Sequence, residues 1–161
     1  MNQNLLRSIT LLTIFKLGNH SNQDVDRLRL NVRQESRQYL LKIQEYGDAQ
    51  DFADLVNVGY GKVICISLST AGGIGVEDDD EIRSGLMYII NFLRELHKGR
   101  NDQPSFQPLP LLVRRTEEQL EEEGALEEME AQMNNVGYFG VVKVFAKLAK
   151  DATLNRFIHN N

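Results

Sequence analysis

The sequence predicts an all-α protein, and three observations point to that class. Apolar residues recur every three or four positions in several long stretches, which is the spacing of one face of an α-helix. Glycines follow these stretches at positions where helices commonly end. The motif Asn-Val-Gly-Tyr occurs twice, and a glycine and an apolar run follow it both times. These features predict a chain of helices with an internal repeat.

The composition is that of a globular protein and excludes several functional classes. The 161 residues suit one domain, so we expect residues 1–161 to form a single domain. A net charge of -5 argues against a nucleic-acid binder held by phosphate contacts. The one cysteine, Cys65, excludes an internal disulfide. No histidine has a second histidine or a cysteine at ligand spacing, so we expect neither a metal nor another cofactor.

The first predicted helix covers the apolar stretch from Leu5 to Leu17. Arg7 and Lys16 interrupt this stretch, and no small-residue cleavage site follows it, so a buried helix fits better than a signal peptide. Gly18 predicts the end of the helix. We therefore expect no membrane insertion and a cytoplasmic location.

A longer helix is predicted to begin at Ser21 and to end at Gly47. Ser21 is a good capping residue and has an acidic residue three positions later, close to a capping box. The apolar positions at helical spacing in this stretch are Val25, Leu28, Val32, Tyr39, Leu40 and Ile43. A short helix is then predicted from Asp51 to Gly59.

The apolar run from Lys62 to Leu68 fits either a buried strand or a buried helix. The repeat favours a helix, because the motif at 57–60 returns at 135–138 and the run after the second copy is helical in pattern. In that second run, lysines recur at helical spacing, at Lys143, Lys147 and Lys150. This spacing predicts a buried stripe on the opposite face, formed by Val141, Val144, Phe145 and Leu148.

The pattern from Val32 onward resembles an armadillo repeat. Ser36 is small and lies four residues after Val32, while Leu40 and Ile43 are apolar and lie eight and eleven residues after it. A short capped turn, a glycine and a third helix follow. A second unit opens with the same spacing at Ile82, Leu86, Ile90 and Leu93, although Leu86 stands where the family has a small residue. The resemblance implies a short right-handed helical solenoid of about two armadillo-like repeats with partial flanking helices, and the related HEAT repeat fits almost as well.

Residues 98–128 interrupt the second unit and are predicted to be an acidic insertion. Pro104, Pro108 and Pro110 prevent a continuous helix through the first part. A glutamate-rich run follows, in which a helix capped at Thr116 is interrupted at Gly124. This segment is either a solvated stretch or a docking element for a basic partner.

The resemblance to armadillo repeats implies a non-enzymatic scaffold or regulatory module that holds a protein or peptide partner in the groove of the solenoid. The residues expected near that groove are Asn57, Tyr60, Asn135, Tyr138, Lys143 and Lys147. The chain has no tryptophan, so it lacks the Trp and Asn ladder with which importin-type members bind basic peptides. Because about three repeats are normally needed for stability, we also expect self-association or a place within a larger helical-repeat protein.

The alternative is a nucleotide-binding or enzymatic α/β domain that uses the glycine-rich loop at 72–75. It needs a strand before this loop and a helix N-terminus after it. The acidic residues 77–81 argue against bound phosphate, because they would lie beside its negative charge. Cys65 lies among apolar residues, as a core cysteine does, and no Ser, His and Asp set stands out. We therefore expect no enzymatic activity.

Overall fold

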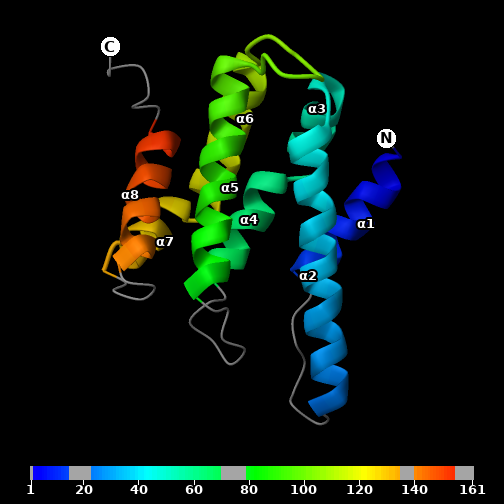
Figure 1. Ribbon diagram of the computed structural model, residues 1–161, viewed down its shortest axis with the longest axis vertical. Coiled ribbons are helices and arrows are strands. Elements are labelled where there is room, and N and C mark those ends of the chain that lie inside the picture. Colours follow the sequence, from blue (N-terminus) through cyan, green and yellow to red (C-terminus); the bar gives the residue numbers. More distant parts are fainter. Residues whose placement is uncertain (1, 15–22, 70–78, 135–139, 155–161) are drawn as a thin grey trace.

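The computed structural model describes residues 2–14, 23–69, 79–134 and 140–154. These residues form eight α-helices and no strand, which confirms the predicted all-α class (Figure 1). An isolated antiparallel bridge joins Arg100 to Phe106. The helices are α1 (Gln3–Thr13), α2 (Gln23–Tyr46), α3 (Ala49–Asn57), α4 (Tyr60–Ser69), α5 (Asp79–Lys98), α6 (Pro110–Glu122), α7 (Ala125–Gln132) and α8 (Val141–Thr153).

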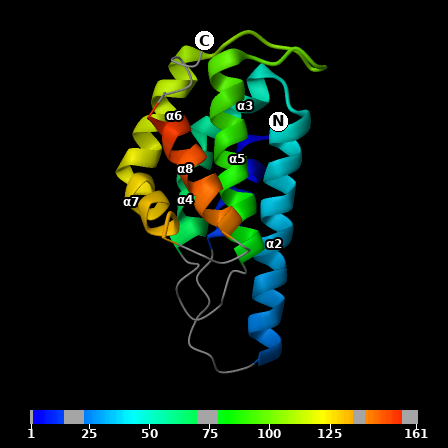
Figure 2. The same ribbon diagram turned by 60° about the vertical axis from the view of Figure 1, so that its left-hand side comes forward.

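In Figure 1, α1, α2 and α3 lie on one side of the molecule and α8 on the other, with α4 and α5 between them. Figure 2 shows α6 and α7 beside α8. The two longest helices are α2 and α5, and α5 packs against α8. Helix α4 packs against α1, α3, α5, α6 and α7, so it is the central helix. Because α4 is enclosed on most sides, its apolar run Val63, Ile64 and Cys65 is buried throughout.

The core between α3, α4 and α5 is built around aromatic side chains. The ring of Phe52 stacks on Phe92 with 5.2 Å between centroids, and it also contacts Phe106 at 4.9 Å. Tyr60 meets Phe92 edge to face at 4.9 Å. Such pairs add about 0.5–1.5 kcal/mol each beyond the burial of their apolar area. The apolar side of α3 is thereby fixed against the middle of the bundle.

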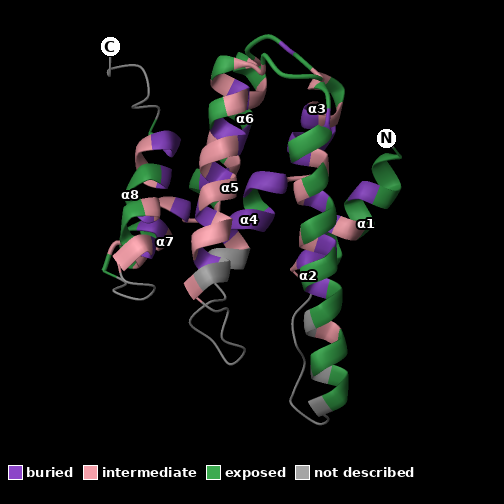
Figure 3. Cartoon of the chain, in the orientation of Figure 1, coloured by how far each residue is buried: buried purple, intermediate pink, exposed green. Residues whose placement is uncertain are grey.

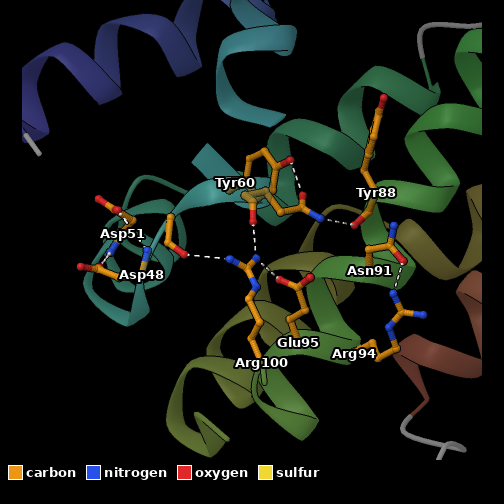
Figure 4. Close-up of polar contacts among 10 residues, drawn as sticks. Asp48, Asp51, Tyr60, Tyr88, Asn91, Arg94, Glu95 and Arg100 are labelled. Carbon is orange, nitrogen blue, oxygen red and sulfur yellow. Dashed lines mark hydrogen bonds and ion pairs between the residues drawn. The ribbon is translucent and has the colours of Figure 1, made fainter. Parts of the chain in front are cut away.

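Arg100 joins the end of α2 to the end of α5. Its guanidinium donates hydrogen bonds to the backbone oxygens of Gln44, at 2.6 Å, and Gly47, at 3.0 Å, and it pairs with Glu95 (Figure 4). It also lies 5.3 Å from the ring centroids of Phe52 and Phe106. The last carbonyls of a helix lack partners within the helix and carry partial negative charge, so a cation is well placed there.

Several helix ends are where the sequence predicted them. Helix α2 ends at Tyr46, directly before Gly47. The carboxylate of Asp48 accepts hydrogen bonds from the backbone N–H groups of Gln50 and Asp51, and the carboxylate of Asp51 accepts one from the backbone N–H of Asp48. These bonds make a capping box at the start of α3. Gly59 has φ +80°, a conformation that favours glycine, and it separates α3 from α4. Helix α1 ends at Thr13, before the expected end at Gly18. Gly18 itself and the expected cap at Ser21 lie outside the described residues.

The run at 60–69 is a helix, as the repeat predicted, and the strand that the α/β alternative requires is therefore missing from this position. The glycine-rich loop at 72–75 lies outside the described residues. With a helix in place of the strand, the arrangement of strand, loop and helix for phosphate does not form around residues 63–69. The α/β core of the alternative is wrong for this chain.

The expected helix within 98–128 begins earlier than predicted. Helix α6 starts at Pro110, because a proline in the first helical position loses no hydrogen bond and already has the helical φ. Thr116 was expected to cap the helix, but it lies inside α6 and its hydroxyl donates to the carbonyl of Leu112 at 2.8 Å. Gly124, in the left-handed conformation, separates α6 from α7 as expected. Both helices contribute buried side chains to the core: Val113, Leu120, Ala125 and Met129.

Candidate functional site

The outer face of α8 exposes a group of apolar side chains. Val144 is 56% exposed and Leu148 is 47% exposed, although both are large hydrophobic residues. Val141 and Phe145 are half-buried beside them, so the four residues at 141, 144, 145 and 148 form one helical stripe. We call these four residues the α8 stripe. Helix α8, which carries the stripe, lies on the opposite side of the molecule from α2 (Figures 1 and 3).

The α8 stripe was expected to be buried, and this prediction was wrong for Val144 and Leu148, whereas Phe145 packs partly against the core. The residues of α8 that face the core are Val142, Ala146, Ala149, Ala152 and Thr153. Helix α8 lies against α5 and α7, and its alanines allow the backbones to approach closely. In the sequence, small residues at i, i+3 and i+6 indicate this contact. The prediction instead assigned the bulkier apolar residues of α8 to the core.

Two lysines flank the α8 stripe on the solvent side. Lys143 and Lys147 are exposed and lie one turn apart on α8. Lys150, in the last turn, forms an ion pair with Glu130 of α7 instead. Within the described part of the chain, no carboxylate pairs with Lys143 or Lys147. The outer face of α8 therefore combines exposed apolar area with two positive charges in an acidic protein.

Tyr60 lies in the core rather than on a binding surface. It is only 2% exposed, and its hydroxyl donates to the side-chain oxygen of Gln44 at 2.7 Å (Figure 4). Gln44 in turn donates to the backbone oxygen of Tyr88 at 3.3 Å. Burial, with a further contribution from Tyr88, raises the pKa of Tyr60 far above its ordinary value. The ring packs against Phe92, so no part of Tyr60 is available to a partner in this structure.

The remaining expected groove residues do not form one cluster in the described structure. Asn57 is exposed at the end of α3, where its side-chain oxygen accepts a hydrogen bond from Arg115 at 2.6 Å. Lys143 and Lys147 lie on α8, which packs against α5 and α7 and not against α3. Asn135 and Tyr138 lie outside the described residues. The structure thus keeps the two lysines together and leaves Asn57 on a separate element.

The acidic helices α6 and α7 form a second charged surface, and part of its charge is already paired. Lys62 of α4 forms an ion pair with Glu123, and Arg114 pairs with Glu118 one turn along α6 at 3.0 Å. His97 lies 3.4 Å from Glu117. The contacts of Glu123 and Glu117 tie α6 to α4 and α5. An acidic docking role for residues 98–128 stays a prediction.

Cys65 is shielded in the core and is expected to react slowly. Its thiol lies 3.7 Å from the backbone oxygen of Glu123, and burial followed by the nearby negative charge of Glu123 raises its pKa to about 11. Only the thiolate attacks alkylating agents, and at pH 8 a thiol of this pKa is almost entirely protonated. We expect iodoacetamide to modify Cys65 at least about 100-fold more slowly in the folded protein than in urea. Mass spectrometry of timed samples measures both rates, and equal rates would contradict the buried position.

The described residues form neither a metal site nor a membrane-spanning helix. In residues 2–14, 23–69, 79–134 and 140–154, no group of three His, Cys, Asp or Glu side chains is arranged to hold a metal ion. In the same ranges, no helix is both long enough and apolar enough to span a bilayer. The outer face of α8 is therefore the candidate site with the clearest chemistry.

Comparisons with known proteins add no assignment: no family model matches the chain, and neither a curated protein nor a solved structure matches it.

Proposed function

We propose that this protein is a non-enzymatic protein-interaction module that binds an acidic amphipathic helix along the outer face of α8. The observation that carries the proposal is the exposure of Val144 and Leu148, 56% and 47%, beside Lys143 and Lys147, which no carboxylate of the described residues pairs with. An amphipathic helix binds through apolar anchors one turn apart, and this face presents apolar positions with the same spacing. Acidic residues in the partner would lie against the two lysines.

The order of the helices supports a repeat architecture for this module. We propose that α2 to α4 form one armadillo-like unit and that α5 to α8 form the second, with α6 and α7 replacing its short middle helix. In each unit a long helix comes first and the unit ends on a helix that follows a glycine with positive φ, at Gly59 and Gly140. The third helix of the first unit, α4, is covered by its neighbours, so α8 is the third helix with an open face.

Reversing the charge of both lysines tests the proposal. The probe is a set of helical peptides that share apolar positions at i, i+3, i+4 and i+7 and carry either glutamate or lysine between them. We expect the glutamate set to bind, and we expect Lys143→Glu with Lys147→Glu to weaken that binding about tenfold or more, because two attractive contacts become repulsive. Fluorescence anisotropy of labelled peptides at low and high salt measures the change.

A matched control separates a local effect from a general change of charge. Arg7→Glu reverses a charge on the exposed surface of α1, away from α8, and should leave the affinity unchanged within about twofold. Leu148→Asp should abolish binding without altering the helical circular dichroism, because Leu148 is exposed. Equal binding of the glutamate and lysine peptides, or full binding by the Leu148→Asp protein, would refute the assignment.

A further inference from the structure

A second exposed apolar stripe runs along α2. It consists of Val25, Leu28, Val32, Tyr39 and Tyr46, which are 39%, 64%, 45%, 45% and 68% exposed. We call these five residues the α2 stripe. The N-terminal half of α2 projects beyond the ends of the other helices, and its surface there is largely exposed (Figures 1 and 3). Three members of the stripe, Val25, Leu28 and Val32, lie in this half.

The spacing of the α2 stripe is that of a coiled-coil seam. Successive members are separated by three, four, seven and seven residues, so they occupy positions a and d of a heptad repeat. Isolated exposed apolar residues are common on protein surfaces, but a series that fills all four a positions and the first d position of three heptads is not. A different side of the helix meets the core, where Ser36, Leu40 and Gln44 are buried. Helix α2 therefore has one side packed in the bundle and a second, apolar side without a neighbour in the described structure.

We propose that the α2 stripe binds the α2 stripe of a second copy of this chain, with the two helices antiparallel. The remaining d positions of the seam are Glu35 and Lys42, and both are exposed. In a parallel pair identical residues meet, so Glu35 would lie beside Glu35 of the second copy and Lys42 beside Lys42. Two antiparallel copies can pair so that Leu28 of one lies against Tyr46 of the other. In this register Glu35 lies in the layer of side chains next to Lys42 of the second copy. The twofold symmetry of the pair forms this contact twice. Charge complementarity thus selects a second copy in antiparallel orientation.

The α2 stripe is long enough for a stable pair. In this register the two helices overlap from residue 28 to residue 46, over which a helix rises about 27 Å, so about two and a half heptads interlock and Val25 lies just beyond the overlap. The contact uses the same surface on both copies, so it closes at a dimer and does not propagate into a fibre. Helices α2 and α8 lie on opposite sides of the molecule, so we expect dimerisation through α2 to leave α8 open on both copies (Figure 1). The inference is therefore independent of the function proposed for α8.

Sedimentation equilibrium of the full chain between about 1 and about 100 µM tests for the dimer. We expect a reversible monomer and dimer equilibrium in this range, with no larger species. Leu28→Asp with Val32→Asp should raise the dissociation constant at least about tenfold, since it puts two carboxylates into the apolar seam. Leu111→Asp, at a residue that is 83% exposed on α6, is the matched control and should leave the constant unchanged. A wild-type protein that stays monomeric, or a dimer that tolerates Leu28→Asp with Val32→Asp, would overturn the proposal.

Charge reversal within the seam tests the orientation. Glu35→Lys alone or Lys42→Glu alone should weaken the dimer about tenfold, because each places like charges in adjacent layers on both sides of the symmetry axis. Combining the two substitutions should restore the wild-type dissociation constant. A parallel pair predicts no loss for either single reversal, because like charges already meet there in the wild type. That result would exclude the antiparallel arrangement, even if α2 mediates the dimer.

Discussion

Replacing Arg100 with alanine is expected to lower the free energy of unfolding by about 3–5 kcal/mol, because it removes one partner of a largely buried ion pair. The side chain of Arg100 is only 9% exposed, and that of its partner Glu95 is 23% exposed. The substitution also leaves the backbone oxygens of Gln44 and Gly47 without their donor at the end of α2. The substitution also removes the apolar stem of Arg100 and the cation–π contacts of its guanidinium with Phe52 and Phe106.

Urea denaturation followed by circular dichroism measures this loss, with Arg114→Ala as the matched control. Arg114 also pairs with a glutamate, but its side chain is 81% exposed, so its removal should cost less than about 0.5 kcal/mol. Arg100→Lys should recover only part of the stability, since an ammonium group does not reproduce the fork of the guanidinium. Similar costs for Arg100→Ala and Arg114→Ala would show that the network of Arg100 contributes nothing beyond a surface pair.

Replacing Gly99 with alanine is expected to cost about 2–4 kcal/mol, because a side chain there would collide with the backbone. Gly99 follows the last residue of α5 and has φ +74°, where residues other than glycine are strained. A Cβ atom would lie 2.4 Å from the backbone oxygen of Phe106 and 3.0 Å from the backbone nitrogen of Pro108. The segment that carries Arg100 would have to move, so the contacts of Arg100 with α2 would weaken too.

Gly140→Ala is the matched control, because Gly140 has nearly the same conformation without the crowding. Its φ is +79°, and a Cβ atom added there would meet nothing within 4 Å. Only the cost of the left-handed conformation, about 1 kcal/mol, should appear in its unfolding free energy. If the two glycine substitutions have equal effects in urea denaturation, the close approach of Phe106 to Gly99 does not contribute to stability.

The sequence identified the helices well where their ends depend on local chemistry. Gly47 stops α2 as predicted, because a helix end depends on residues that are neighbours along the chain. The start of α3 was predicted at Asp51, but the helix begins at Ala49, after the cap at Asp48. The start of α6 was predicted too late, since Pro110 was taken as a helix breaker although a proline is tolerated in the first turn. The class of fold followed from the helical spacing of apolar residues, from the glycines after these stretches and from the repeated motif.

The candidate site was only partly predictable. Lys143 and Lys147 were identified from their spacing, and both are exposed on α8. Tyr60 was placed near a groove, but its ring fills the space beside Phe92 in the core. Tyr60 was predicted as a groove residue because it ends the repeated motif at 57–60. That motif comes at the start of α4 and carries no information on which elements cover this helix.

The sequence by itself determined that this chain is helical, where most helices end and which residues are apolar. Tertiary structure alone decided which apolar residues are buried. Helices α2 and α8 each have two sides that could be buried. In α2 the buried side carries Leu40 and its polar neighbours, and in α8 it carries the alanines. The physical reason is that burial depends on how closely a neighbouring helix approaches, and α5 fits against the small side chains of α8. The bulkier stripes remain on the surface, on helices that lie on opposite sides of the molecule, and both proposals of partner binding rest on them.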